Sequence, residues 1–451
     1  MDVSDFPTPE LGDRRLNDRY VRILEQAQRR PDASFPHMVR SSAELEAAYR
    51  FFSNKKVAFD KLLCPHVDAT VERCRELPEV IVAHDTTEFR FKGLPYEESS
   101  REGLGHLTGK GQGFFLHASL AICGDESGAP LGVIGAESWA RTPKRATGQD
   151  QAIHRWGRLA SVAGERLGDC RVVHVMDREA DVYSVFDSIQ QRGEGFVIRI
   201  RHNRRCEESG FKLLDALVDV TPISKREIRI SSRVAKGSAD RRRAYPSRKG
   251  RRAKIVIRAA QVKIADTKKT STGSDALCLN LLHLTEPNPP PGEPAVDWKL
   301  LTTEPTSTSQ EVERVVDIYR KRWRIEEFFK ALKSGCAIES RQLESLHALQ
   351  NVVAMMVPVA WHLLAIRTMA HQHPDLSAQT VFSPLQLKIL RKLTDRPPPE
   401  NTTVGQALQS IAALGGHIRN NGDPGWIVLG RGYQELIRAE RVWRIATCDQ
   451  S

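Results

Sequence analysis

The stretch Asp317-Ile-Tyr-Arg-Lys-Arg-Trp-Arg-Ile-Glu-Glu-Phe-Phe-Lys-Ala-Leu-Lys333 decides the expected fold. Read as an α-helix at about 100° per residue, it divides into a polar and an apolar face. The polar stripe, whose members are three or four residues apart and span about 80°, consists of Tyr319, Arg322, Glu326, Lys330 and Lys333. The apolar arc consists of Ile318, Ile325, Phe328, Phe329 and Leu332. We therefore expect a helix that packs on a core through its apolar arc and turns the polar stripe to solvent.

One carboxylate of this stripe, that of Glu326, stands among three cations and a phenol. Single Glu/Lys pairs at such spacings are usually surface salt bridges that contribute little to stability. The combination of a glutamate with Arg, Lys and Tyr side chains favours a functional role instead. Glutamate binds divalent metals through oxygen, while Arg, Lys and Tyr bind phosphate. Glu327 points about 100° away, towards other neighbours. The stripe thus has the groups of a phosphoryl-transfer site that acts on a polyanion.

The charge of the chain is positive and concentrated. The 451 residues carry a net charge of +11, with a pI near 9.3, which indicates an acidic partner. Between Lys225 and Arg258 there are fourteen Lys and Arg against two acidic residues, a local charge of +12 that leaves about −1 for the remainder. A localised basic segment favours nucleic acid as the partner. Because Tyr245 is its only aromatic residue, we expect it to bind phosphates without choosing sequence, through residues such as Arg241, Arg242 and Arg243.

The remaining composition narrows the class of protein. The eight cysteines are scattered without metal-ligand spacing, so we expect reduced thiols, a cytoplasmic location and no zinc site. The N-terminus lacks the basic and apolar regions of a signal peptide. The most apolar run, Val352 to Ile366, contains Pro358 and His362 and is too short to span a bilayer, so it predicts a buried helix.

Hydrophobic patterns upstream of the polar stripe predict an α/β domain built on one sheet. Expected strands lie at 79–85, 116–123, 130–139, 171–177 and 195–201, and expected helices at 59–75, 150–167 and 180–191. Two amphipathic helices precede this domain, at 10–30 and 43–52, the second capped by Ser41 or Ser42. A β-rich insertion is expected at 203–301, and a helical tail with helices at 404–414 and 433–445 follows residue 369.

Two aspartates end apolar strands of this domain. Asp85 closes the first strand and Asp177 the fourth. Because reactive groups collect at the carboxyl ends of strands in an open α/β sheet, both carboxylates would meet at one edge, where Glu326 can join them. Each aspartate could instead cap the following helix. Asp181 and Glu88 are acidic neighbours that spacing alone does not exclude.

Several motifs resemble the bacterial cut-and-paste DDE transposases of insertion sequences. Tyr319, Arg322, Glu326 and Lys333 match the family's Tyr-(2)-Arg-(3)-Glu-(6)-Lys signature, as found in the branch typified by the transposase of the composite kanamycin-resistance transposon. Asp85-Thr-Thr and Asp177-Arg-Glu-Ala-Asp181 match the segments around its two catalytic aspartates. Leu11-Gly-Asp-Arg-Arg-Leu16 and Ala48-Tyr-Arg-Phe-Phe52 resemble its N-terminal DNA-binding domain.

This resemblance implies a ribonuclease-H-like catalytic core at 59–368 that carries the insertion. A helical DNA-binding domain would occupy 1–58, and a helical domain for dimerisation and synapsis would occupy 369–451. Asp85, Asp177 and Glu326 would be the catalytic carboxylates and would hold two Mg²⁺ ions about 4 Å apart, with Mn²⁺ as a substitute. Tyr319, Arg322 and Lys333 would bind a phosphate of the strand that is not transferred, and Lys330 shares their stripe. Trp298, at a position where a tryptophan is more often core, would stack on a flipped base.

The resemblance implies hydrolysis at transposon ends followed by attack of the freed 3′-OH on target DNA by a homodimer. Two other hypotheses remain at this stage. One is a ribonuclease-H-like nuclease that cuts DNA without joining it, and the other is a transposase-derived DNA-binding protein that has lost catalysis. Terminal inverted repeats around the gene and a strand-transfer assay would distinguish the three.

Overall fold

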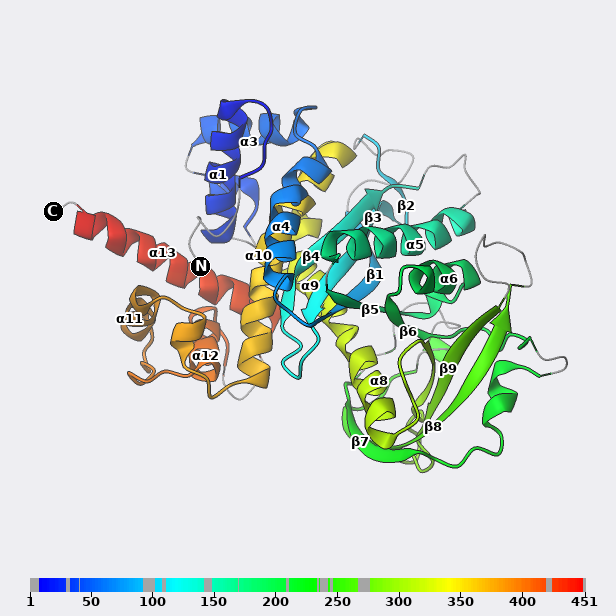
Figure 1. Cartoon of the computed structure of the whole chain (residues 1–451). Helices are drawn as coiled ribbons and strands as arrows, with labels where there is room; N and C mark the ends of the chain where they lie inside the picture. The colour runs from blue at the N-terminus through cyan, green and yellow to red at the C-terminus, as the bar shows by residue number, and fades with distance from the viewer. Residues whose placement is uncertain are drawn as a thin grey trace.

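A large mixed sheet organises the computed structural model of the chain (Figure 1). The structure describes residues 8–29, 33–39, 41–91, 102–107, 111–141, 148–168, 170–207, 211–232, 235, 242–243, 246–266, 276–418 and 424–448. Ten strands form the sheet in the order β2-β3-β1-β5-β6-β10-β9-β8-β7, with β4 paired to β3. The strands are β1 Glu79–Phe91, β2 Gly105–His106, β3 Gln112–Cys123, β4 Pro130–Trp139, β5 Arg171–Met176, β6 Gly195–Arg199, β7 Ser224–Ile230, β8 Arg251–Ala265, β9 Ala276–Thr285 and β10 Asp297–Thr302.

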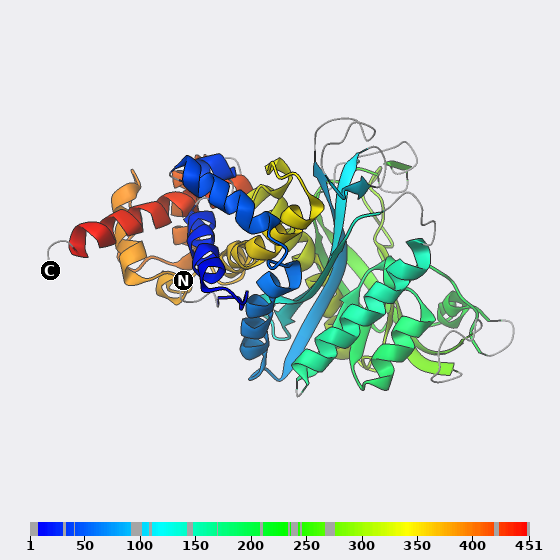
Figure 2. The same cartoon turned by 90° about the horizontal axis from the view of Figure 1, so that it is seen from above.

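Helices cover both faces of the sheet (Figure 2). The helices of the described chain are α1 Arg14–Arg29, α2 Phe35–Met38, α3 Ser42–Ser53, α4 Phe59–Cys74, α5 Gly148–Leu167, α6 Tyr183–Gln191, α8 Ser309–Lys321, α9 Trp323–Lys330, α10 Leu346–Gln372, α11 Pro384–Leu393, α12 Val404–Leu414 and α13 Trp426–Cys448, of which the N-terminal α1–α3 and the C-terminal α11–α13 lie away from the sheet. On one face α9 lies against β1 and α10 against β4, while α5 and α6 lie together on the other face. The predicted α/β class is therefore confirmed, and all five expected core strands are present.

The β-rich insertion, which the sequence predicted without its connection to the core, joins the core sheet. Strands β7, β8 and β9 are antiparallel, as alternation predicted, but they do not form a separate sheet. β9 pairs with β10, and β10 pairs with β6, so the insertion extends the core sheet. Local sequence pattern cannot show this, because the pairing depends on where β10 returns along the edge of β6.

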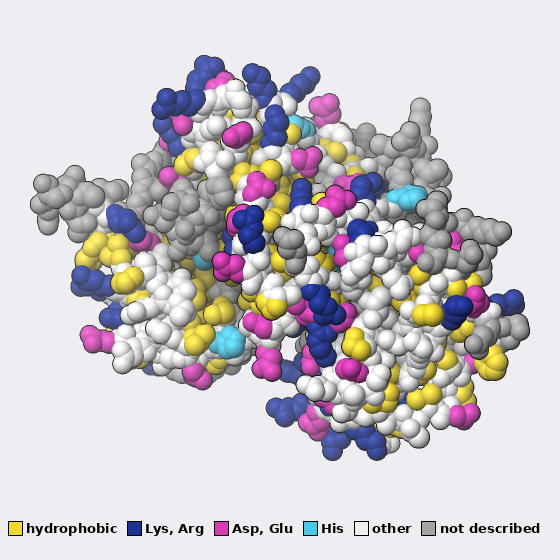
Figure 3. Space-filling view, in the orientation of Figure 1, with side chains coloured by type: hydrophobic (Ala, Val, Ile, Leu, Met, Phe, Trp, Pro, Cys, Tyr) yellow, Lys and Arg dark blue, Asp and Glu magenta, His cyan; other side chains and the backbone are white. Residues whose placement is uncertain are grey.

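The N-terminal helices follow the expected pattern. Tyr20, Ile23, Leu24 and Ala27 of α1 are buried, and Leu16 packs against them. Ser41 caps α3 by accepting a hydrogen bond from the Glu44 amide at 3.3 Å, which decides between the two serines that the sequence offered. Lys and Arg side chains gather over these helices on the visible face (Figure 3).

The buried helix expected around Val352–Ile366 is α10, which continues through Pro358 and is 27 residues long. By length and composition alone it could cross a membrane, but 89% of its apolar window is buried inside the protein. It lies between the sheet and the C-terminal helices (Figure 1). We therefore assign it as the central core helix. Among the C-terminal helices, α12 has the predicted bounds, α13 begins earlier than predicted, and α11 was not predicted.

The expected single α-helix at 317–333 is divided into three parts. α8 ends at Lys321, α9 runs from Trp323 to Lys330, and a π-helix occupies Ala331–Gly335. At the junction, the amides of Arg322 and Ile325 donate to carbonyls three residues back, which makes a tighter turn than an α-helix has. In the π-helix, the Cys336 amide donates to the Ala331 carbonyl five residues back at 2.9 Å. The angular positions that one regular helix predicts are therefore wrong at its C-terminal end.

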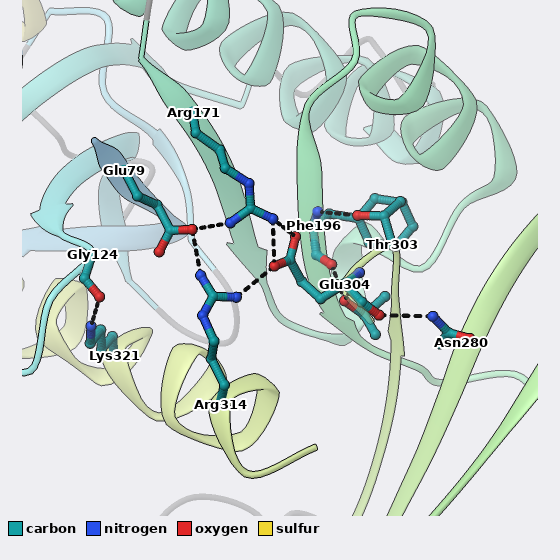
Figure 4. A network of polar contacts seen from close by, with 10 residues as sticks. Glu79, Gly124, Arg171, Phe196, Asn280, Thr303, Glu304, Arg314 and Lys321 are labelled. Carbon is teal, nitrogen blue, oxygen red and sulfur yellow. Dashed lines mark hydrogen bonds and ion pairs between the residues drawn. The ribbon is translucent and has the colours of Figure 1, made fainter. Parts of the chain in front are cut away.

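A partly buried ionic network joins α8 to the sheet (Figure 4). Arg314 of α8 and Arg171 of β5 both pair with Glu79 at the start of β1 and with Glu304, which follows β10. At the end of α8, the Lys321 ammonium donates to the carbonyls of Gly124 and Asp125 at 2.8 and 2.6 Å. These contacts hold α8 against the starts of β1 and β5, and so set where Arg322 and α9 lie.

Candidate active site

Asp85 and Asp177 lie side by side where β5 ends, but Asp85 does not close its strand as predicted, because β1 continues to Phe91 and stays paired with β3. β1 and β5 are parallel neighbours, with Ala83 opposite Val175. Asp85 lies two residues after Ala83, and Asp177 lies two residues after Val175. Ile81, Ala83, Val173 and Val175 belong to the core on the α9 and α10 side. Because side chains alternate along a strand, Asp85 and Asp177 turn to this same side, on strands about 4.8 Å apart. The predicted convergence of the two aspartates is thus observed.

Asp177 and its acidic neighbour Asp181 make different contacts in the structure. Asp181 is buried, accepts from the amides of Arg201 and His202 at 2.6 and 2.8 Å, and pairs with Arg204. Its carboxylate therefore serves the local fold. Asp177 caps a short 3₁₀-helix by accepting from the Glu179 amide through Oδ1 at 2.9 Å, so the capping role considered from sequence is also real. A cap of this kind fixes the side chain while it faces Asp85.

Glu326 is joined to Asp85 through the side chain of Arg322. The Arg322 guanidinium donates to Asp85 Oδ2 at 3.1 Å and to Glu326 Oε1 at 2.6 Å, so it bridges the sheet and α9. Its side chain is 13% exposed, against 19% for Asp85 and 28% for Glu326. Glu327 pairs instead with Arg324 at 2.9 Å, as its direction on the helix predicted. Glu88, the acidic neighbour of Asp85, pairs with Arg90 at 3.0 Å.

The carboxylates repel one another electrostatically. Burial raises the pKa of Asp85 to about 7, and the charges of Asp177 and Glu326 act in the same direction, against the attraction of Arg322. Burial thus outweighs the salt bridge. A carboxyl group whose pKa is raised by burial and by two neighbouring carboxylates lies in a site that gains from a bound cation. In the described part of the chain, no group of three such side chains is spaced to enclose a metal ion as the side chains stand, and a guanidinium holds two of the three carboxylates.

Tyr319 and Trp298 lie beside this site, and Tyr319 is less exposed than its place on the polar stripe predicted. Tyr319 is buried, which corrects its expected place on a solvent-facing stripe. Its ring meets the partly buried Trp298 ring edge-on, with centroids 5.4 Å apart. Packing against β10 explains the burial, because the strand returns under the end of α8.

The two lysines of the stripe contact other groups. Lys330 is exposed and lies over the Trp323 ring, 5.1 Å from its centroid. Lys333 lies over the Phe89 ring at 5.6 Å, and its pKa is lowered by burial despite Glu339 and Glu88 nearby. The π-helix carries Lys333 towards the far end of β1. The structure therefore brings together Asp85, Asp177, Arg322 and Glu326, places Tyr319 and Trp298 next to them, and directs Lys330 and Lys333 to neighbouring aromatic rings.

The sequence did not predict two arginines whose charges act near the site, Arg141 and Arg201. Arg141 follows β4, is exposed, and stacks over Phe115 at 4.4 Å. Its charge acts on Glu179, two residues from Asp177, as does that of Arg201. Neither arginine belongs to a recognisable motif. Only the pairing of β3 with β1 and β4, which brings Phe115 opposite both Glu88 and Trp139, places Arg141 at this end of the sheet.

Comparison with known proteins gives two family matches. A family model described as "Transposase DNA-binding" matches residues 4–57, and one described as "Transposase DDE domain" matches residues 76–359. The second range includes Asp85, Asp177 and Glu326. The structure is also similar to that of a piggyBac transposase synaptic complex with hairpin DNA, solved by cryo-EM, with a TM-score of 0.37 and 10% sequence identity. The match covers 78% of this chain and 65% of the piggyBac chain, so the chain spans about two thirds of that protein's length.

Proposed function

The chain belongs to the family of transposases with a DDE domain, and from this premise we propose that it is a cut-and-paste DNA transposase. It would hydrolyse a phosphodiester at each transposon end and use the freed 3′-OH to attack target DNA. The observation that carries the proposal is the meeting of three carboxylates from distant segments, with Asp85 and Asp177 at matching positions of parallel strands and Glu326 joined to Asp85 by Arg322. We assign the chain to the branch with the Tyr-Arg-Glu-Lys signature on Tyr319, Arg322, Glu326 and Lys333.

The donor set fits a divalent cation. Asp85, Asp177 and Glu326 offer carboxylate oxygens, which Mg²⁺ prefers, and a cationic group already lies between two of them. We propose that these three residues hold Mg²⁺, or Mn²⁺ in its place. Such an ion supplies Lewis-acid activation of the attacking oxygen and charge stabilisation of the leaving oxygen. The chain itself positions the donors, through the parallel strands, the Asp177 cap and the network that fixes α8.

The order of the elements supports a ribonuclease-H-like core. An antiparallel group, β4-β3-β1, is followed by parallel β5 and β6, with α5 and α6 between strands and α8 to α9 last. We propose this core at 59–368, with the insertion at about 203–301, a DNA-binding domain at 1–58 and a C-terminal domain at 369–451. The C-terminal domain would pair two copies in a synaptic complex on two DNA ends.

DNA would approach the edge of the sheet that carries the carboxylates. We propose that Arg322 and Tyr319 bind a backbone phosphate there, and that Lys330 and Lys333 add positive charge along the same segment. Trp298 would stack on an unpaired base, which requires its ring to part from Tyr319.

The basic insertion provides a second DNA surface. Its solvent-facing side chains include Lys225, Arg229, Arg252 and Lys254, and Arg229 lies directly opposite Arg252 in the β7–β8 pair. Like charges in such a pair destabilise a sheet unless an anion lies between them. Lys and Arg side chains gather at the lower edge of the molecule, in the region of β7 (Figure 3). Arg241 and Tyr245, which the sequence placed in this surface, lie outside the described residues.

Replacing Arg229 and Arg252 together with Gln should weaken binding to end DNA and random DNA alike. We expect the slope of log affinity against log salt to fall by about one unit per lost phosphate contact, because fewer counterions are released. Fluorescence anisotropy with a labelled duplex measures both quantities. Arg226→Gln is the matched control, because Arg226 lies on β7 but pairs inward with Asp317 at 2.9 and 3.0 Å. Loss of discrimination between end and random DNA at an unchanged slope would mean that this surface reads bases.

A strand-transfer assay tests the proposed function, because a nuclease would also cut the DNA but would not join its ends to a target. Purified protein with Mg²⁺, a linear DNA bearing the terminal repeats that flank the gene, and a supercoiled target should give single- and double-end insertions at 3′-OH ends. Cleavage without any joined product would favour the nuclease. Binding without cleavage would favour a DNA-binding protein derived from a transposase.

A further inference from the structure

Arg322 stands where a cation would stand. Its guanidinium contacts oxygens of both Asp85 and Glu326, carboxylates from segments 241 residues apart that the proposed metal would also have to join. Arg320, two residues earlier near the end of α8, is exposed and pairs with Asp317 at 3.2 Å. Arg322 is thus directed inward by its place in the turn between α8 and α9, while its neighbour points out.

We infer that, in the protein without DNA, the Arg322 guanidinium occupies the place of the divalent cation and lowers metal affinity until a DNA phosphate draws it away. This inference rests on the proposed function, since it takes the three carboxylates as the metal site. The oxygens that Arg322 holds are donors that the metal needs, so the two cations compete for them. A fixed guanidinium and a divalent ion a few ångströms apart also repel each other strongly in a partly buried site.

DNA supplies the alternative partner for Arg322. Guanidinium binds phosphate in a two-pronged geometry at least as well as it binds carboxylate, and a phosphate at the site would offer it an anion outside the carboxylate pair. By linkage, whatever removes Arg322 from the carboxylates raises their affinity for metal, and bound metal in turn favours the phosphate-bound arginine. The arrangement keeps the hydrolytic site without its metal when no DNA is present.

The test is Mn²⁺ binding to DNA-free, metal-stripped full-length protein, measured by titration calorimetry. We expect Arg322→Gln to bind Mn²⁺ at least about tenfold more tightly than the native chain, because a positive charge within contact distance has been removed. Arg320→Gln is the matched control and should stay within about twofold of the native chain, since it removes an equal charge that does not touch the carboxylates. Arg322→Lys should give a smaller gain, because one ammonium cannot span both carboxylates as a guanidinium does. It also serves if the Gln variant fails to fold, as judged by thermal melting.

Two outcomes overturn the inference while leaving the proposed function intact. One is equal Mn²⁺ affinity in the native chain and Arg322→Gln, and the other is an equal gain in Arg320→Gln, which would reflect the general field of the protein. Adding Glu326→Gln to Arg322→Gln should abolish the gain. If no variant binds Mn²⁺ saturably, or if Glu326→Gln and Asp177→Asn leave binding unchanged, the metal site itself is wrong, and the proposed function fails together with the inference.

Discussion

Replacing Glu326 with Gln should reduce DNA cleavage about a thousandfold or more while leaving end binding nearly unchanged. The change removes one carboxylate charge from a site that stabilises charge in the transition state, an effect of several kcal/mol, and each 1.36 kcal/mol is about tenfold in rate. Asp85→Asn and Asp177→Asn should have effects of similar size. A nicking assay on labelled end DNA measures cleavage, and a gel shift measures binding.

The chain offers a close control for each carboxylate. Glu327→Gln changes the adjacent residue of α9, which pairs with Arg324 rather than with Arg322. Glu88→Gln changes an acid three residues from Asp85 on the same strand, which pairs with Arg90. Both variants should cleave within about an order of magnitude of the native chain. Metal-dependent cleavage at a native rate by any one of the Asp85, Asp177 or Glu326 variants would remove that residue from the site.

Replacing Glu304 with Gln should lower the free energy of unfolding by about 2–4 kcal/mol, because it leaves two guanidiniums beside a neutral buried amide. Glu304 is 2% exposed and accepts from Arg171 and Arg314, with Arg314 Nη1 at 2.7 Å. The expected loss of unfolding free energy is smaller than for a fully buried ion pair. The reason is that Arg171 and Arg314 are 49% and 40% exposed and keep Glu79 as a partner. Urea unfolding, followed by circular dichroism, gives the difference from the shift in midpoint at constant slope.

An exposed ion pair provides the comparison for Glu304. Glu72 and Arg75 of the α4 end are 61% and 66% exposed, so Glu72→Gln should cost under about 0.5 kcal/mol. Cleavage should also fall in Glu304→Gln, since a looser α8 no longer fixes Arg322 and Glu326 against Asp85. A loss for Glu304→Gln no larger than that for Glu72→Gln would mean that the network does not hold α8.

The features that the sequence predicted well are those set by local pattern. The apolar runs at 79–85 and 171–177 lead to Asp85 and Asp177, and the parallel pairing of these two runs places the aspartates side by side. The end of the first strand was predicted wrongly, because β1 continues past Asp85 to Phe91. The buried face of α1 and the Ser41 cap depend on spacing within a few residues, and they too were predicted.

The features that the sequence could not predict depend on contacts between distant segments. A regular helix from 317 to 333 correctly made Arg322 a neighbour of Glu326. The π-helix at Ala331–Gly335 turns Lys333 towards Phe89 instead, and Lys330 lies over Trp323. Tyr319 is buried because β10 returns beneath it. The bridge from Arg322 to Asp85 spans 237 residues, and no local signal records it.

Fe²⁺-directed cleavage of the polypeptide is the most direct test of the proposal that Asp85, Asp177 and Glu326 hold one metal centre. Fe²⁺ accepts the same oxygen donors as Mg²⁺, and with ascorbate and peroxide it produces radicals that cut the backbone next to the bound ion. On the full-length protein with end DNA bound, we expect three sets of cuts in the polypeptide, near residues 85, 177 and 326. Excess Mg²⁺ should suppress all three sets, and Asp177→Ala should abolish them. Cuts confined to one of these segments, or placed elsewhere in the chain, would contradict the proposal.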